Sequence, residues 1–279
     1  MSAPARRSHR FAIRCARIAA AAAIAVHATP AAAAEAKAAP APAWYAGRFG
    51  VSTGFDWSTG KYGESQSTEV WYVPLNLRYE WHHWLFRTTV PYLRVTGPGT
   101  TTVGGGLIFS GNQTGNRQTR DGLGDVIAGV TYRFDPPLPW FPYLDATLKA
   151  KFPTASASRG LGTGEFDTTL QLDATKPFGA LSVFGNVAYR FVGDPPGTSF
   201  QNTAAASIGV DWRIARPISV GGYYSWRQTA SRSLGDAHEV ASYASWSVGH
   251  GFTIGPYVLV GLSTAAPDVE AGLQLGFKH

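Results

Sequence analysis

Cysteine is almost absent from this chain of 279 residues, since Cys15 is the single one. The lack of cysteine elsewhere excludes stabilisation by disulfide bonds. Long apolar runs are missing too: after the first thirty or so positions there is no run of about 18 uncharged apolar residues, which excludes a helical membrane protein. Apolar residues nevertheless make up 44% of the sequence and aromatic residues 13%, too much for a disordered chain. A mostly β protein remains, either soluble or in a membrane.

The N-terminal segment carries a targeting pattern. Five arginines and no acidic residue lie in the first seventeen positions, a small apolar stretch covers 18–26, and an alanine run ends at Ala34. This order predicts a secretory signal peptide over residues 1–34. The Ala- and Pro-rich residues 35–43 predict a flexible periplasmic tether. Cys15 precedes the apolar stretch, so it does not stand where a lipoprotein would be cleaved.

An excess of positive charge is also lacking once this segment is set aside. Five of the 24 Lys and Arg residues belong to the signal peptide, which leaves 19 basic residues against 18 acidic ones. The formal net charge of +6 therefore arises mainly from the targeting segment. We expect no nucleic-acid partner, because a nucleic-acid site needs a basic patch in the folded domain.

Alternation with a period of two dominates residues 44–279. Apolar side chains occupy every second position in segments of about ten residues, which is the period of a β-strand. In one segment, for example, Trp71, Val73 and Leu75 alternate with Tyr72 and Pro74. Twelve such segments occur, at 48–57, 71–80, 84–92, 125–133, 144–152, 167–174, 182–191, 206–213, 218–227, 239–248, 252–262 and 269–278.

The polar faces of these segments are rich in Gly, Ser, Thr and Asn and carry scattered charges of both signs. Such a face fits a crowded, hydrated lumen better than the surface of a soluble sandwich. Connections after even-numbered segments are mostly short, whereas those after odd-numbered segments are longer, especially 95–122, 154–164, 193–201 and 228–237. This alternation and the even count predict an all-β fold, a twelve-stranded antiparallel transmembrane β-barrel over residues 44–279 in the bacterial outer membrane.

Aromatic residues collect at both expected ends of the strands. The set near the periplasm is Trp44, Trp84, Tyr132, Trp212, Trp246, Phe252 and Phe277, and the set near the outside is Trp57, Trp71, Tyr92, Phe152, Tyr189 and Trp226. Two such girdles are typical of the two interfaces of a bilayer. We therefore expect outer-membrane lipids around the barrel and the outer-membrane assembly machinery as a partner.

Two glycine-rich strings stand out, DGLGD at 121–125 and RGLGTGE at 159–165. A phosphate-binding loop needs a helix N-terminus, and no helical pattern follows either string. We expect tight loops whose glycines adopt positive φ just before a membrane strand.

Three longer strings, DGLGDVIAGVTYRF, KFPTASASRGLGTGEFDTTL and YRFVGDPPG, resemble the outer-membrane barrel family named for the MetA-pathway of phenol degradation, whose members are commonly labelled transporters. The resemblance extends from about Gly50 to the C-terminus. It implies a barrel with a role in the uptake of small compounds, aromatic ones included. One departure is that Lys278 and His279 follow Phe277, whereas barrels of this kind usually end on an aromatic residue.

A barrel enzyme is the less favoured alternative. The histidines after the signal peptide lie in turns, at strand ends or at the terminus: His82, His83, His238, His250 and His279. We interpret His82 and His83 as a periplasmic turn. His238 stands beside Asp236 and Glu239, which leaves an acid–histidine hydrolase site conceivable. No second acidic pair accompanies it, so we expect neither an enzyme nor a metal or cofactor site.

Inward-facing charges are the candidate functional residues. The predicted lumen lining is Arg78, Arg87, Arg133, Asp145, Lys149, Lys151, Asp167, Arg190, Asp211 and Arg213. Such charges either set the selectivity of a pore or form a ladder of ion pairs that fills the lumen. Lys149 and Lys151 stand out as two residues of one sign on one strand, with Asp167 able to approach from the next strand and Arg133 balancing Asp145. We predict that changing both lysines to glutamate shifts selectivity toward cations.

Passive passage of small-molecule solutes across the outer membrane is the preferred function. The alternative is a structural or surface-interaction barrel with a plugged lumen. Both stay open at this stage, because twelve strands fall between filled barrels of about eight strands and open barrels of about sixteen.

Overall fold

The structure is a computed structural model that describes residues 47–62, 65–98, 100–103, 106–109, 117–195, 200–232 and 234–278, with backbone alone for 100–103 and 106–109. The predicted signal peptide and tether lie outside the described residues. No helix among the described residues is long and apolar enough to cross a membrane.

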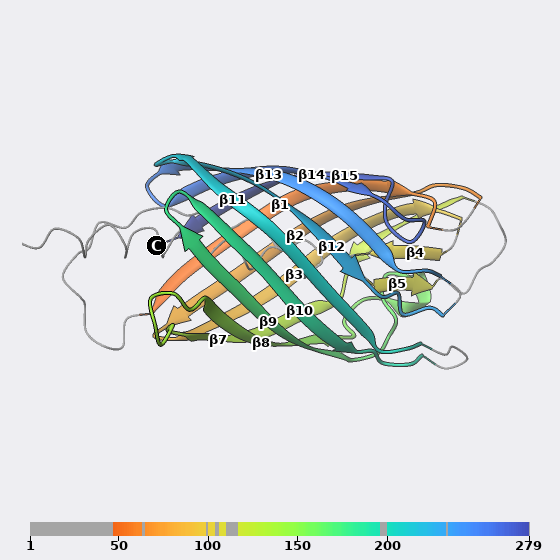
Figure 1. The fold of residues 1–279 in the computed structure, drawn as a ribbon. Helices are drawn as coiled ribbons and strands as arrows, with labels where there is room; N and C mark the ends of the chain where they lie inside the picture. Colours follow the sequence, from red (N-terminus) through yellow and green to blue (C-terminus); the bar gives the residue numbers. More distant parts are fainter. Residues whose placement is uncertain are drawn as a thin grey trace, which may run out of the picture.

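Twelve tilted antiparallel strands form the wall of a closed barrel (Figure 1). In chain order they are β1 (Arg48–Gly60), β2 (Thr68–Trp81), β3 (Trp84–Gly97), β6 (Gln118–Leu123) continued by β7 (Val126–Phe134), β8 (Tyr143–Phe152), β9 (Asp167–Phe178), β10 (Leu181–Phe191), β11 (Thr203–Ala215), β12 (Ile218–Arg227), β13 (Ala237–Gly249), β14 (Phe252–Gly261) and β15 (Val269–Lys278). Because β1 pairs with both β2 and β15, the sheet closes on itself as a hydrocarbon environment requires. The predicted fold is confirmed.

The fourth wall strand is longer than the sequence pattern predicts. Both β6 and β7 pair with β3, and the break between them falls at Gly124 and Asp125, where the Gly124 N–H donates to the Pro91 carbonyl at 2.9 Å. The strand thus begins at Gln118, and β3 runs on to Gly97. The prediction that 95–122 is a connection was wrong at both ends, because β3 and β6 extend into this range and pair with each other. Polar residues there hide the alternation of apolar side chains.

The two glycine-rich strings have different structures. Gly122 has a φ of +150° but lies inside β6, so DGLGD is an irregularity in a paired strand and not the expected loop. In RGLGTGE, Gly160 and Gly164 have φ values of +68° and +78° and lie in the β8–β9 connection, as predicted. That connection also contains a single 3-10 turn, η2 (Ala157–Arg159). A short hairpin of β4 (Thr100–Val103) and β5 (Gly106–Phe109) lies at the barrel end opposite the C-terminus (Figure 1).

Apolar side chains cover the outside of the barrel, and polar ones lie inside. On β11, for example, Ile208 is 62% exposed while the neighbouring Ser207 is 7% exposed. Exposed aromatic residues at the strand ends confirm much of both predicted girdles: Trp84, Trp212, Trp246 and Phe252 near the C-terminal end, and Trp71, Tyr92, Phe152 and Tyr189 near the other. Trp44 lies outside the described residues. A closed barrel with an apolar outer surface belongs in a lipid bilayer, here the bacterial outer membrane.

Closure leads to a prediction about electrophoresis. A cylinder in which every wall strand is hydrogen-bonded on both sides resists detergent until it is heated. We expect unboiled protein to migrate at a different apparent size from boiled protein on a detergent gel. Equal migration, or a helical circular dichroism spectrum, would contradict the fold.

Candidate functional site: the barrel lumen

The lumen is closely packed in the described part of the barrel. Ten of the inward polar side chains from the barrel strands belong to residues at most 9% exposed: Asp56, Asn76, Asp167, Gln171, Asp173, Asn186, Asp211, Glu239, Glu270 and Gln274. A wide aqueous pore would leave such residues in contact with water. Any path at these positions therefore runs between closely packed polar side chains.

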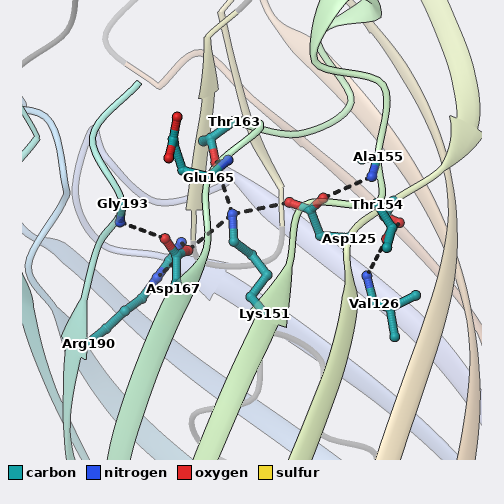
Figure 2. Close-up of polar contacts among 11 residues, drawn as sticks. Asp125, Val126, Lys151, Thr154, Ala155, Thr163, Glu165, Asp167, Arg190 and Gly193 are labelled. Carbon is teal, nitrogen blue, oxygen red and sulfur yellow. Dashed lines mark hydrogen bonds and ion pairs between the residues drawn. The ribbon is translucent and has the colours of Figure 1, made fainter. Parts of the chain in front are cut away.

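One cluster of charges lies at the end of the barrel with the long connections (Figure 2). Lys151 Nζ is 3.1 Å from both Asp125 Oδ2 and Asp167 Oδ2, and it donates to Thr163 Oγ1 at 2.9 Å. Asp167 also pairs with Arg190 and accepts a hydrogen bond from the Gly193 N–H at 2.8 Å. We call Lys151, Asp125, Asp167 and Arg190 the Lys151 cluster.

The Lys151 cluster anchors the β8–β9 connection, residues 153–166, against the barrel. The Ala155 N–H donates to Asp125 Oδ1 at 3.0 Å (Figure 2). Farther along the connection, Leu161 is 1% exposed and packs with Tyr72 of β2 and Leu93 of β3, whose side chains face inward. The connection thus folds over the inside of the barrel. Sequence alone did not predict this, because the connection looks like an ordinary Gly- and Ser-rich loop.

A second cluster lies at the periplasmic end and centres on Glu80. Its carboxylate pairs with Arg78, with Arg133 at 3.7 Å and with Lys278 at 3.2 Å. Arg133 also lies 3.8 Å from Asp145, the partner predicted across the hairpin. Lys278, the polar residue near the C-terminus, thereby links the last strand to β2. We call Glu80, Arg78, Arg133 and Lys278 the Glu80 cluster.

Lys149 and Arg87 lie between these two clusters. Lys149 Nζ donates to Gln171 Oε1 at 2.6 Å, and Gln171 Nε2 donates to Asp173 Oδ1 at 2.6 Å. The two lysines that the sequence pairs are therefore in different settings: Lys151 is held between two carboxylates, whereas Lys149 contacts a neutral amide. Their joint effect on selectivity stays a prediction, but the structure makes Lys149 the less compensated charge.

The opposite wall holds aromatic side chains and carboxylates. Phe184 and Tyr243 form a buried cluster with Tyr223 and Tyr257. The Tyr243 hydroxyl donates to Asp211 at 3.2 Å, the Tyr257 hydroxyl donates to Glu270 at 2.7 Å, and Arg227 pairs with Glu239 at 3.1 Å. Asp211 and Arg213 thus lie on β11, apart from the two clusters. The aromatic group was missed, although Phe184 stands at an inward position of its strand.

The acid–histidine site considered around His238 does not form among the described residues. Residues 82 and 83 form the expected turn between β2 and β3. His238 Nδ1 lies 2.6 Å from the Tyr224 hydroxyl, whereas Asp236 accepts a hydrogen bond from Trp226. Glu239 points into the lumen from the opposite face of the strand, where Arg227 binds it.

Comparisons with known proteins agree with the barrel. The chain is similar to the crystal structure of an outer membrane channel from Pseudomonas putida F1, with a TM-score of 0.61 and 15% identity over 87% of this chain and 100% of that one. Weaker likenesses are the translocator domain of the autotransporter NalP from Neisseria meningitidis (TM-score 0.49, 13% identity, 83% and 88% coverage) and the CymD monoaromatic hydrocarbon channel (TM-score 0.46, 10% identity, 82% and 87% coverage).

No curated protein matches the chain. A family model does match, and it covers nearly all of the barrel. Residues 46–278 fit the family described as "Putative MetA-pathway of phenol degradation", which agrees with the resemblance of the three glycine-containing strings. The chain belongs to this family of outer-membrane barrels.

Proposed function

We propose that the barrel allows small solutes to pass passively across the outer membrane. The observation that carries this proposal is the series of polar side chains from the Glu80 cluster at the periplasmic end, through Arg87, Lys149 and Gln171, to the Lys151 cluster at the other end. A barrel that served only as a scaffold could fill its interior with apolar side chains, as small barrels can. Charged and hydrogen-bonding groups instead offer a solute replacements for its hydration shell.

Aromatic compounds are the solutes to test first. The family takes its name from phenol degradation. The cluster of Phe184, Tyr223, Tyr243 and Tyr257 inside the lumen supports this choice, because aromatic rings favour contact with one another in offset or edge-to-face geometry.

A structural barrel with a filled lumen is the second candidate. It is favoured by the close packing of the inward polar residues and by the inward fold of the β8–β9 connection. The two candidates differ in whether the barrel conducts ions and whether release of the connection increases that conductance.

Leu161→Ser tests the proposed function in a planar lipid bilayer. Leu161 packs against Tyr72 and Leu93, so replacing it with serine should release the β8–β9 connection from the outer end of the lumen. We expect the parent barrel to conduct and the variant to conduct several-fold better. Leu138→Ser is the control, because Leu138 is 48% exposed in the turn between β7 and β8. Absence of conductance in both the parent and Leu161→Ser would favour the structural barrel.

A further inference from the structure

One row of cross-strand neighbours in the lumen carries five cations. Gly50 is opposite both Lys278 and Arg78, Arg78 is opposite Arg87, and Arg87 is opposite Gly129. The row continues through Lys149 and Thr169 to Arg190. Directly opposed residues in antiparallel strands point to the same face of the sheet. We call Lys278, Arg78, Arg87, Lys149 and Arg190 the basic row, which contains no carboxylate.

The basic row runs obliquely from one end of the lumen to the other. Neighbours in register lie across the strands, and the strands are tilted (Figure 1). The row therefore begins with Lys278 at the end of β15, near the periplasm, and reaches Arg190 at the outer end of β10. Gly129 stands between Arg87 and Lys149 in register and places no side chain between them, and the stem of Lys149 lies beside it.

Charge compensation differs along the basic row. At its ends, Glu80 binds Lys278 and Arg78, and Asp167 binds Arg190. In its middle, neither Arg87 nor Lys149 has a carboxylate oxygen within 4.0 Å in the described part of the chain.

The nearby carboxylate of Asp173 compensates the middle of the row only in part. It acts electrostatically on both Arg87 and Lys149, and it is bound by the amide of Gln171. Glu80 also acts on Arg87, but three other cations, Arg78, Arg133 and Lys278, already share its single charge. Arg87 and Lys149 together therefore exceed the negative charge of Asp173 by one. A half-buried cation with no carboxylate in contact is costly, so this place favours an anion that supplies the missing negative charge.

We propose that Arg87 and Lys149 form a binding site for the carboxylate of a small organic monoanion on its way through the lumen. A guanidinium presents a planar fork of donors that matches a carboxylate, and the lysine ammonium adds a second charge from the strand on the other side of Gly129. One negative charge neutralises the local excess. This inference rests on the proposed function and names the class of solute.

The site is tested by measuring the binding of benzoate to the detergent-solubilised barrel with equilibrium dialysis. We expect the parent to bind benzoate and not benzamide, its uncharged counterpart. Arg87→Gln and Lys149→Gln should each weaken benzoate binding by about tenfold, the loss expected for a hydrogen bond to a charged group. Arg227→Gln is the control, because it removes the same charge on the opposite wall, where Arg227 pairs with Glu239.

Three results would overturn the site: no benzoate binding, equal binding of benzamide, or equal weakening by Arg227→Gln. A bilayer measurement separates this inference from the proposed function. In a salt gradient, Arg87→Gln and Lys149→Gln should shift the reversal potential toward cations. A parent that conducts with a reversal potential unchanged in both variants would contradict the anion site but keep solute passage. A parent that binds benzoate without conducting would contradict passage but keep the site.

Discussion

Asp167→Asn is expected to lower the stability of the barrel by about 3 kcal/mol, the cost of removing one partner from a buried ion pair. Asp167 is 2% exposed and binds Arg190 and Lys151 together (Figure 2). Asparagine keeps the size of the side chain and removes its charge, so both cations lose a partner. The measurement is the temperature at which unboiled protein changes to the migration of boiled protein on a detergent gel.

The matched control for this change is Asp121→Asn. Asp121 is an exposed residue whose carboxylate accepts a hydrogen bond from the Tyr92 hydroxyl at 2.6 Å. The same substitution there should leave the transition temperature nearly unchanged. If the two variants unfolded at the same temperature, the Lys151 cluster would contribute no more than a surface contact.

Val130→Arg is expected to destabilise the barrel in lipid by about 2–4 kcal/mol, the cost of an arginine on the lipid face near the bilayer midplane. Val130 is the middle residue of β7 and lies opposite Phe86 and Leu148, which are 41% and 45% exposed on the outer surface. Unfolding by urea in lipid vesicles, followed by tryptophan fluorescence, measures the difference.

Thr131→Arg is the control on the neighbouring position. Thr131 faces the lumen, where its hydroxyl contacts the Thr147 hydroxyl at 2.9 Å. An arginine there meets polar groups and should cost less than one at Val130. If Thr131→Arg cost more, the register of β7 would be shifted by one residue, since such a shift exchanges the two faces of a strand.

The sequence was sufficient to predict the class of fold, the number of strands and the facing of residues such as Val130 and Thr131. These properties follow from local patterns, because alternation with a period of two shows which face meets lipid without reference to any other strand. The start of the fourth strand was not predicted, because residues 118–123 read QTRDGL and show no alternation of apolar and polar side chains. Their pairing with β3 is a long-range interaction that leaves no local signal.

The sequence also proposed a set of charges for the lumen, but it did not show which of them are in contact, because that depends on the register between strands. Lys149 and Lys151 look alike along the chain, yet one contacts Gln171 and the other is held between Asp125 and Asp167. Glu80 and Lys278 are 198 residues apart and form an ion pair because β1, between their strands, closes the barrel. The basic row likewise exists only across seven strand pairings. Alternation along the sequence predicts whether a side chain faces lipid or the lumen, whereas barrel closure and strand tilt determine which side chains are its neighbours.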